Sequence, residues 1–157
     1  MSDAPDCLRP VSCKDLLDEP HSHAIRYFER SSNRVDSDES ACGSSFDVAA
    51  LEGPRSVGLE VAMNVVARDV SFRIYVGLQF GFEKDLELSR EVYADFLVEN
   101  VLPALMPILT TWTLGEIQTM QPSGYVEVPF TEVYPVLGES IRSKIMSRKA
   151  GAVLSAD

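Results

Sequence analysis

The chain has 157 residues, which is long enough for one domain that buries about two thirds of its unfolded surface. Its hydrophobic fraction of 45% and charged fraction of 24% are typical of a soluble globular protein. The formal net charge of −10 argues against nucleic acid and anionic membranes as partners, because both would repel the chain.

The N-terminal segment carries acidic residues where a secretory signal would need a basic and then an apolar segment. No apolar run approaches the roughly 18 residues of a membrane span, so we expect no membrane insertion. The three cysteines, Cys7, Cys13 and Cys42, lie in the polar N-terminal third, and their odd number favours free thiols over a disulfide framework. These features predict a cytoplasmic protein.

Composition divides the chain into three parts. We predict a flexible N-terminus, a single α+β domain and a flexible tail, over residues 1–10, 11–149 and 150–157. Within the domain, residues 11–30 are compatible with a short helix or an edge segment. Residues 31–45 are rich in Ser, Asp and Gly and predict a loop. A short strand is expected over residues 46–51, before Gly53 and Pro54.

Two long strands are predicted next, over residues 57–65 and 72–82, because large apolar side chains alternate with polar or small ones in both. Arg68 and Asp69 lie where a tight turn would join the two strands. The pattern predicts an antiparallel hairpin with one apolar face, which other elements must cover.

Apolar residues recur at helical spacing after Ser89, whose side chain is suited to cap a helix over residues 90–100. Pro103 and Pro107 lack an amide donor, so we expect a break between two helices at this point. The second helix is expected to begin at or near Pro107 and to end at Gly115.

The rest of the chain is predicted to form an extended segment over residues 117–130 and an amphipathic helix over residues 137–146. Strands thus come first and helices later, an order that is typical of α+β proteins and not of βαβ units. The helices are expected to cover the apolar face of the hairpin.

Few side chains indicate catalysis. His21 and His23 would share one face of a strand, as two metal ligands could, but their spacing matches no zinc pattern and a solvated loop pair is the simpler interpretation. The acidic runs at residues 83–87 and 91–99 are best explained as solvated faces. The sequence contains neither a nucleophile elbow nor a glycine-rich phosphate loop. We expect no enzymatic activity, no metal and no cofactor.

Large apolar side chains are more numerous than a small sheet under two helices can bury. Phe80 and Phe82 on the strand, with Tyr93, Phe96 and Trp112 beyond it, are expected to meet where the hairpin and the helices pack. Each of them alone is best explained as core. Together they predict that some apolar area is left for subunit contact or for a ligand.

Three short motifs follow one another in the chain: VGLQFGF at residues 76–82, LMP at residues 105–107 and MQPSGYVEVPF at residues 120–130. Their order resembles that of the SecB family of export chaperones, over about residues 57–130. The resemblance implies a four-stranded antiparallel sheet with helices on one face and assembly into homodimers or homotetramers. It also implies binding of non-native polypeptides without ATP, in protein export or with toxin–antitoxin pairs.

The chain departs from this family at the helix opening, where Met106 and Ile108 stand in place of the usual aromatic residues, and in its basic C-terminal part. The residues before about position 55 are also less strand-like than the opening strands of the family. The first two departures argue against engagement of SecA, so no SecA-docking residues are transferred.

Three functional hypotheses follow. The first is a SecB-like holdase that captures unfolded segments in an apolar groove between the sheet and residues 83–100, with hydrogen bonds added at an open sheet edge. Its predicted polypeptide-binding residues are Leu78, Phe80, Phe82, Leu86, Leu88, Tyr93, Phe96 and Trp112. The second is a non-enzymatic interaction or assembly protein that binds one folded partner. The third is a small thioesterase-like enzyme, with Glu91 or Asp95 beside a tunnel.

Overall fold

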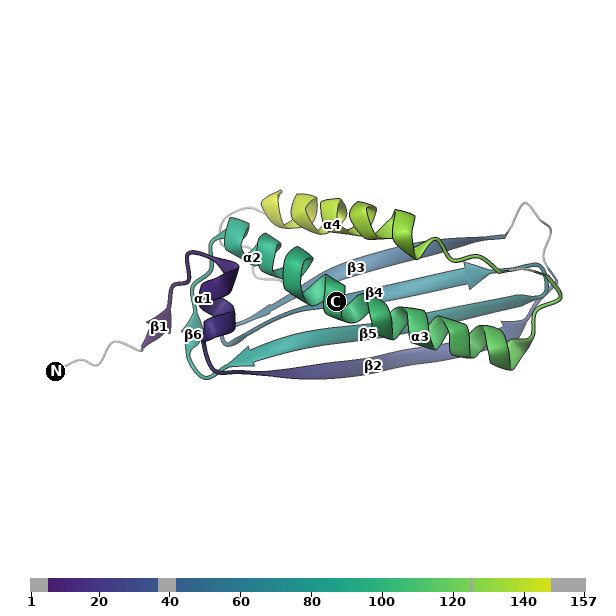
Figure 1. Ribbon diagram of the computed structural model, residues 1–157, viewed down its shortest axis with the longest axis horizontal. Helices are drawn as coiled ribbons and strands as arrows, with labels where there is room; N and C mark the ends of the chain where they lie inside the picture. The colour runs from purple at the N-terminus through teal and green to yellow at the C-terminus, as the bar shows by residue number, and fades with distance from the viewer. Residues whose placement is uncertain (1–5, 37–41, 125, 148–157) are drawn as a thin grey trace.

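A computed structural model describes residues 6–36, 42–124 and 126–147 (Figure 1). Its main element is a four-stranded antiparallel sheet. The strands are β2 (His21–Arg34), β3 (Gly43–Gly53), β4 (Ser56–Val66) and β5 (Val70–Phe82). They lie in the order β2-β5-β4-β3, so β2 and β3 are the two edges. This sheet confirms the predicted α+β class and the number of strands.

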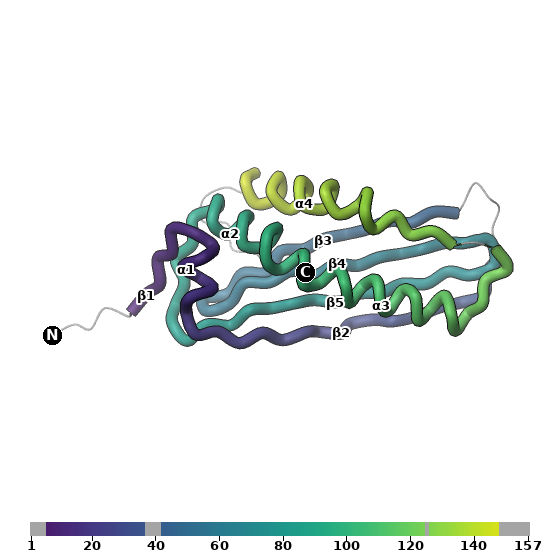
Figure 2. Tube along the Cα trace, in the orientation of Figure 1, coloured from purple at the N-terminus to yellow at the C-terminus, as the bar shows by residue number. Residues whose placement is uncertain are grey.

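The helices pack on one face of the sheet (Figures 1 and 2). They are α2 (Arg90–Phe96), the π-helical turn η2 (Leu97–Val101), α3 (Leu102–Met120) and α4 (Phe130–Met146), while the short helix α1 (Cys13–Asp18) lies at one end of the sheet beside α2. The α2–η2–α3 stretch is continuous and crosses the sheet diagonally, while α4 lies over β3. Two further short strands, β1 (Cys7–Leu8) and β6 (Asp85–Leu86), form a separate parallel pair at one end.

The central hairpin β4–β5 places its large apolar side chains on the face that the helices cover. Leu59 pairs with Leu78 and Val61 with Val76, and all four are buried. Arg68 and Asp69 form the turn, which is closed by a 2.8 Å hydrogen bond from the Ala67 amide to the Val70 carbonyl. Alternation of apolar and polar residues therefore predicted both the pairing and the buried face of these strands correctly.

Strand pairing extends into both ends of the predicted loop over residues 31–45. Residues 31–34 belong to β2 and pair with β5, and residues 43–45 belong to β3 and pair with β4. These ends are polar because they lie on edge strands, where solvent reaches the side chains. Residues 11–30 contain both of the expected alternatives, since α1 is followed directly by β2.

Part of the predicted flexible N-terminus is paired within the fold. Within the predicted flexible N-terminus over residues 1–10, Cys7 and Leu8 are paired with β6, which places this part of the segment on the fold. The predicted tail over residues 150–157 lies outside the described residues.

The predicted break between two helices is wrong. The Leu102 amide bonds to the Leu97 carbonyl, five residues back, so the π turn changes the hydrogen-bond register directly before Pro103. Pro103 directly follows this change of register, and both Pro103 and Pro107 are accommodated within the continuous helical stretch. The helix also continues past Gly115 and ends at Met120, after which Gln121 adopts a left-handed conformation with φ of 45°.

The segment after α3 is shorter than predicted. Residues 117–120 still belong to α3, and the predicted last helix begins earlier, at Phe130, as α4. The described residues between 121 and 129 form neither helix nor strand. They carry the chain back along the sheet to the start of α4 (Figure 1).

The continuous helix Arg90–Met120 is long and apolar enough to cross a membrane by length and composition, contrary to the expectation from the sequence. More than half of its most apolar window, 56%, is buried within the fold. The helix is apolar on the side that covers the sheet, as is usual for a core helix of a globular domain.

Candidate functional site

The structure places the predicted polypeptide-binding residues mostly in the core. Five of them, Leu78, Phe80, Phe82, Tyr93 and Phe96, are buried, and Leu86, Leu88 and Trp112 are partly buried against them. Phe80 meets Phe96 edge to face, with ring centroids 5.3 Å apart. Trp112 lies further along α3 and stacks on Tyr27 of β2 instead. The groove role of this set stays a prediction, since the folded chain encloses most of it.

Three exposed apolar side chains lie close together on β2 instead. Residues 21–28 are all solvent-exposed, and among them Ile25, Tyr27 and Phe28 expose 41%, 56% and 44% of their surface. Within the described part of the chain β2 pairs with β5 alone, so its other edge presents unpaired backbone groups. A long edge strand with exposed apolar side chains is a template for pairing with another extended segment.

A shallow hollow of about 250 Å³ lies between this strand and α3. It is lined by Tyr27, Pro107, Ile108, Thr111 and Trp112. The Tyr27 and Trp112 rings stack with centroids 4.5 Å apart and planes 12° from parallel. Ile25 points to the same face of β2 as Tyr27, two residues away. We call these six residues the β2–α3 shelf.

An ion pair between β2 and α3 links the two elements that form the shelf. The Arg30 guanidinium of β2 donates to the Glu116 carboxylate of α3, which is buried, and lies 5.3 Å from the centre of the Trp112 ring. A Cβ atom at Gly115 would lie 2.7 Å from Nη2 of Arg30, so a larger residue there would require the Arg30 side chain to shift.

Sequence reasoning missed both partners of this ion pair. A signal was present, because Glu116 follows Trp112 by four residues and thus shares its helix face, where an isolated carboxylate requires a partner. Arg30 could not be matched to it from the sequence, because the two residues are 86 positions apart.

The opposite face of the sheet is polar. The Tyr75 hydroxyl donates to the Glu60 carboxylate, and this hydrogen bond is the main reason that the pKa of Tyr75 is raised to about 12. Arg73 donates from Nε to Oε2 of Glu29 at 2.9 Å. A β-bulge after Tyr27 places Phe28 on this face, where its ring stacks on that of Tyr75 with centroids 4.4 Å apart. These contacts fix β2 firmly to β5.

The histidine pair lies on a strand, not in the solvated loop that the sequence favoured. His21 and His23 share one face of β2, and both rings lie within 6 Å of the Phe80 ring centre. Among residues 6–36, 42–124 and 126–147, no three His, Cys, Asp or Glu side chains are grouped so that they could hold a metal ion.

The acidic runs are paired with basic residues, which supports a structural role for them. Asp85 contacts Arg55 and Glu87 contacts Arg9, in both cases at 2.6 Å. Arg142 of α4 contacts Asp95 and Glu99, which links α4 to α2 and η2.

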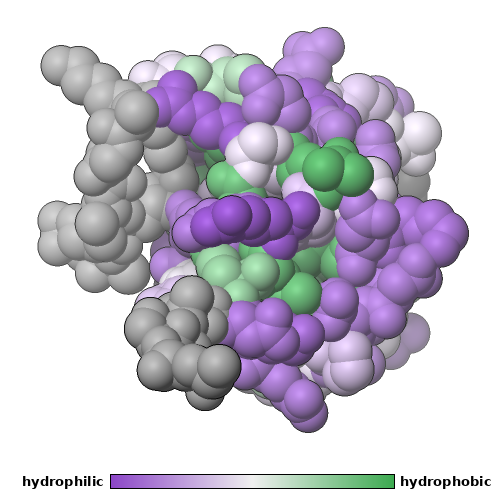
Figure 3. All heavy atoms as spheres, turned by 90° about the vertical axis from the view of Figure 1, so that its left-hand side faces the viewer, coloured by the Kyte–Doolittle hydropathy of each residue, from purple (hydrophilic) through white to green (hydrophobic). Residues whose placement is uncertain are grey.

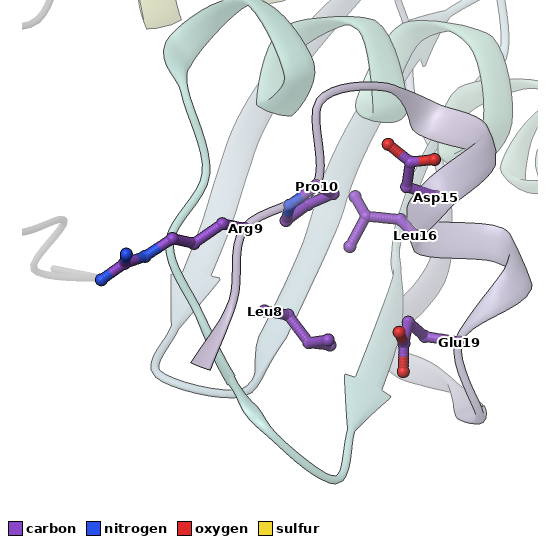
Figure 4. A pocket seen from close by; sticks show the side chains of 6 residues that line it. All are labelled: Leu8, Arg9, Pro10, Asp15, Leu16 and Glu19. Atoms are coloured by element: carbon purple, nitrogen blue, oxygen red, sulfur yellow. The ribbon is translucent and has the colours of Figure 1, made fainter. Parts of the chain in front are cut away.

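The covered end of the sheet is closed by the N-terminal segment. Residues 6–19, which we call the N-terminal cover, place β1 beside β6 and α1 beside α2. A cavity of about 170 Å³ remains between β1 and α1, with Leu8, Pro10 and Leu16 among its lining residues (Figure 4). The cover thus lies over the end of the sheet where the groove between the sheet and residues 83–100 was predicted.

Comparison with known proteins gives a structural similarity but no match in sequence. No family model and no curated protein matches the chain. Among solved structures, the chain is similar to a Mycobacterium tuberculosis SecB-like chaperone in complex with a peptide from an antitoxin. The two share 12% sequence identity over 69% of this chain and 89% of that chain, with a TM-score of 0.47. At this level of similarity, the function has to be inferred from the chain's own surfaces.

Proposed function

We propose that this protein is an ATP-independent holdase chaperone, SecB-like in its mode of action, that binds extended non-native polypeptide segments along β2. The observation that carries the proposal is the combination of an open edge strand with exposed Ile25 and Tyr27 and an apolar hollow directly beside it. An incoming segment would add as a further strand and gain backbone hydrogen bonds that do not depend on its sequence.

Side chains of the bound segment would provide a general preference for apolar sequences. Because successive side chains of a strand point to opposite faces, every second one would lie beside Ile25 and Tyr27 at the rim of the shelf. The aromatic surfaces of Tyr27 and Trp112 suit aliphatic and aromatic side chains alike. The acidic net charge of −10 favours basic over acidic clients.

Binding by strand addition requires an edge strand that is already ordered, and it does not require a nucleotide. The Arg30–Glu116 ion pair and the stacking of Phe28 on Tyr75 hold β2 in position before a client arrives, which lowers the entropic cost of binding. The full proposal is a cytoplasmic protein that acts as a homodimer or homotetramer. Its clients would be polypeptides destined for export or an antitoxin partner.

The test is suppression of aggregation of the reduced insulin B chain, followed by light scattering. The wild-type chain in molar excess is expected to suppress the signal. The double variant Ile25→Lys/Tyr27→Lys should need about tenfold more protein for the same effect, because two ammonium groups at the edge oppose both strand addition and the packing of apolar client side chains on the shelf. Val136→Lys serves as the matched control, since Val136 is an exposed apolar residue on α4, away from β2.

Equal aggregation with and without the wild-type protein would overturn the proposal. Capture of a single folded partner in a fixed ratio from native extract, with no effect on unfolded clients, would instead support an interaction or assembly protein. Suppression that Ile25→Lys/Tyr27→Lys leaves unchanged would exclude β2 as the binding edge.

A further inference from the structure

The N-terminal cover is bound to the fold in the manner of a short peptide ligand. Cys7 and Leu8 form a parallel strand pair with Asp85 and Leu86, in register. The Glu87 amide donates to the Leu8 carbonyl at 2.9 Å, which extends the pairing by one more hydrogen bond. This is strand addition to a free strand edge, the same kind of contact that a client segment would make.

Two leucines of the cover fill the space beneath it. Figure 4 shows Leu8 and Leu16 pointing into the gap between β1 and α1, whereas Arg9 points away from it. Leu16 is fully buried and joins the hydrophobic core, and Leu8 packs against that core. The end of the molecule seen in Figure 3 accordingly shows apolar atoms near its middle, surrounded and crossed by hydrophilic side chains.

The N-terminal cover is held to the fold by few buried contacts. Of the six residues of α1, all of which are described, Leu16 alone is buried, while its neighbour Leu17 is 41% exposed. The ion pairs that fasten the cover, Arg9 with Glu87 and Asp6 with Lys84, are largely solvent-exposed and therefore contribute little. The β1–β6 pair is two residues long.

Predicted polypeptide-binding residues lie next to this cover. Leu86 is the direct strand partner of Leu8, and Leu88 lies two residues further on, partly buried. The cover leads into β2, whose first residue, His21, pairs with Phe82 and has its ring 5.7 Å from that of Phe80. Detachment of the cover would expose the apolar end of the sheet at these residues.

We propose that β6 and the leucine pocket beside it form a second polypeptide-binding site, which the N-terminal cover occupies in the resting chain. The inference deepens the proposed chaperone function and rests on it. The occupant that fits is a segment that pairs with β6 over a few extended residues and then turns back to place a second aliphatic side chain in the same pocket, as Leu8 and Leu16 of the chain's own residues 6–19 do. Such a segment, supplied by a client, competes with the cover and is admitted when the cover detaches.

The first experiment measures binding of a fluorescein-labelled peptide with the sequence of residues 6–19, carrying serine in place of Cys7 and Cys13, by fluorescence anisotropy. Leu16→Ala in the full chain removes the buried anchor of the cover. This variant is expected to bind the peptide about fivefold or more tightly than the wild type. Leu17→Ala is the matched control, because it truncates the exposed leucine of the same helix and should bind as the wild type does.

A covalent lock provides the opposite test and remains valid if Leu16→Ala does not fold. Asp85→Cys places a thiol on the register partner of Cys7, at the separation of paired strands, so oxidation can tie β1 to β6. The oxidised variant should bind the peptide about fivefold or more weakly than the same molecule after reduction. Wild-type protein under the same two redox conditions should show no difference.

The outcomes separate this inference from the proposed function. Equal peptide affinity of the oxidised and reduced Asp85→Cys variant would overturn the inference, even if the wild type suppresses aggregation through β2. A redox-dependent peptide affinity would support the second site. Failure of the wild-type chain to suppress aggregation would overturn the chaperone function itself, whatever the peptide result.

Discussion

The two edge strands of the sheet, β2 and β3, differ in what packs beside them. Beside β3 lies α4, whose Lys144 donates from Nζ to the Val48 carbonyl at 2.9 Å. Phe46 of β3 packs against Phe130 of α4, with ring centroids 6.2 Å apart. Beside β2, by contrast, residues 21–28 are all exposed, and the apolar side chains Ile25 and Tyr27 lie next to an open hollow.

The difference shows that β2 is the more exposed of the two edges. An edge strand that a helix and a lysine cover is protected against pairing with other chains, whereas a long open edge with apolar side chains promotes it. Because both strands are polar at their ends and similar in length, this asymmetry arises from what packs beside each strand. The following changes test it, in order of the expected effect.

The largest difference is expected between aromatic truncations on the two edges. Phe46→Ala should lower the free energy of unfolding by about 2 kcal/mol, because Phe46 packs against the core and against Phe130. Tyr27→Ala should lower it by less than about 1 kcal/mol, because the ring is mostly exposed. Urea unfolding followed by circular dichroism measures both values. A cost for Tyr27→Ala as large as that for Phe46→Ala would contradict the view that β2 is open.

A smaller effect is expected from removal of the lysine that covers β3. Lys144→Met loses a hydrogen bond to the Val48 carbonyl and should reduce the free energy of unfolding by about 1 kcal/mol. It should also increase concentration-dependent self-association, measured by sedimentation velocity. Lys14→Met is the control, since Lys14 is exposed and contacts Asp18 within α1. No change in either property would mean that Lys144 does not protect this edge.

The smallest effect concerns the outer face that fixes β2 to β5. The hydrogen bond to Glu60, together with burial and the negative charge of Glu60, raises the pKa of Tyr75 from 10.0 to about 12. Between these two pH values the unfolded chain releases the phenolic proton and the folded chain retains it, so stability falls as pH rises through this window. Ultraviolet absorbance of the phenolate, with Tyr75→Phe as reference, measures the pKa directly.

Glu60→Gln should return the pKa of Tyr75 toward its ordinary value, because the amide replaces a charged acceptor. An unchanged midpoint in this variant would show that burial of the ring, and not the carboxylate, controls the titration.

Local patterns predicted the central hairpin and failed at the edges for an identifiable reason. In β4 and β5 each buried residue alternates with a polar or small one, so the strand and its inner face could be assigned from neighbouring residues alone. In β2 most side chains face water, and the strand therefore carries no comparable alternation. The π turn before Pro103 was missed because proline normally predicts the end of a helix, and a change of hydrogen-bond register is not visible in the sequence.

The sequence predicted an apolar binding surface, but between the sheet and residues 83–100 and not between β2 and α3, where the shelf lies. Trp112 was included among the predicted residues and lines the shelf, but its partner Tyr27 lay in a segment predicted as a short helix or an edge segment, with no contact to Trp112 foreseen. Phe80 and Phe82 were predicted to line a groove and are buried, Phe80 against the rings of Phe96 and His21, and Phe82 against that of His21. None of these contacts leaves a periodic signal, since each involves residues far apart in the chain.

Local sequence patterns were sufficient to predict an α+β domain around a long apolar hairpin, because alternation and helical spacing are properties of adjacent residues. They could not predict which edge of the sheet stays open or which apolar surface is covered. Those outcomes depend on contacts between distant residues, such as Lys144 with Val48 and Arg30 with Glu116. Their stabilising effect exists only once the packing of α3 and α4 brings the partners together.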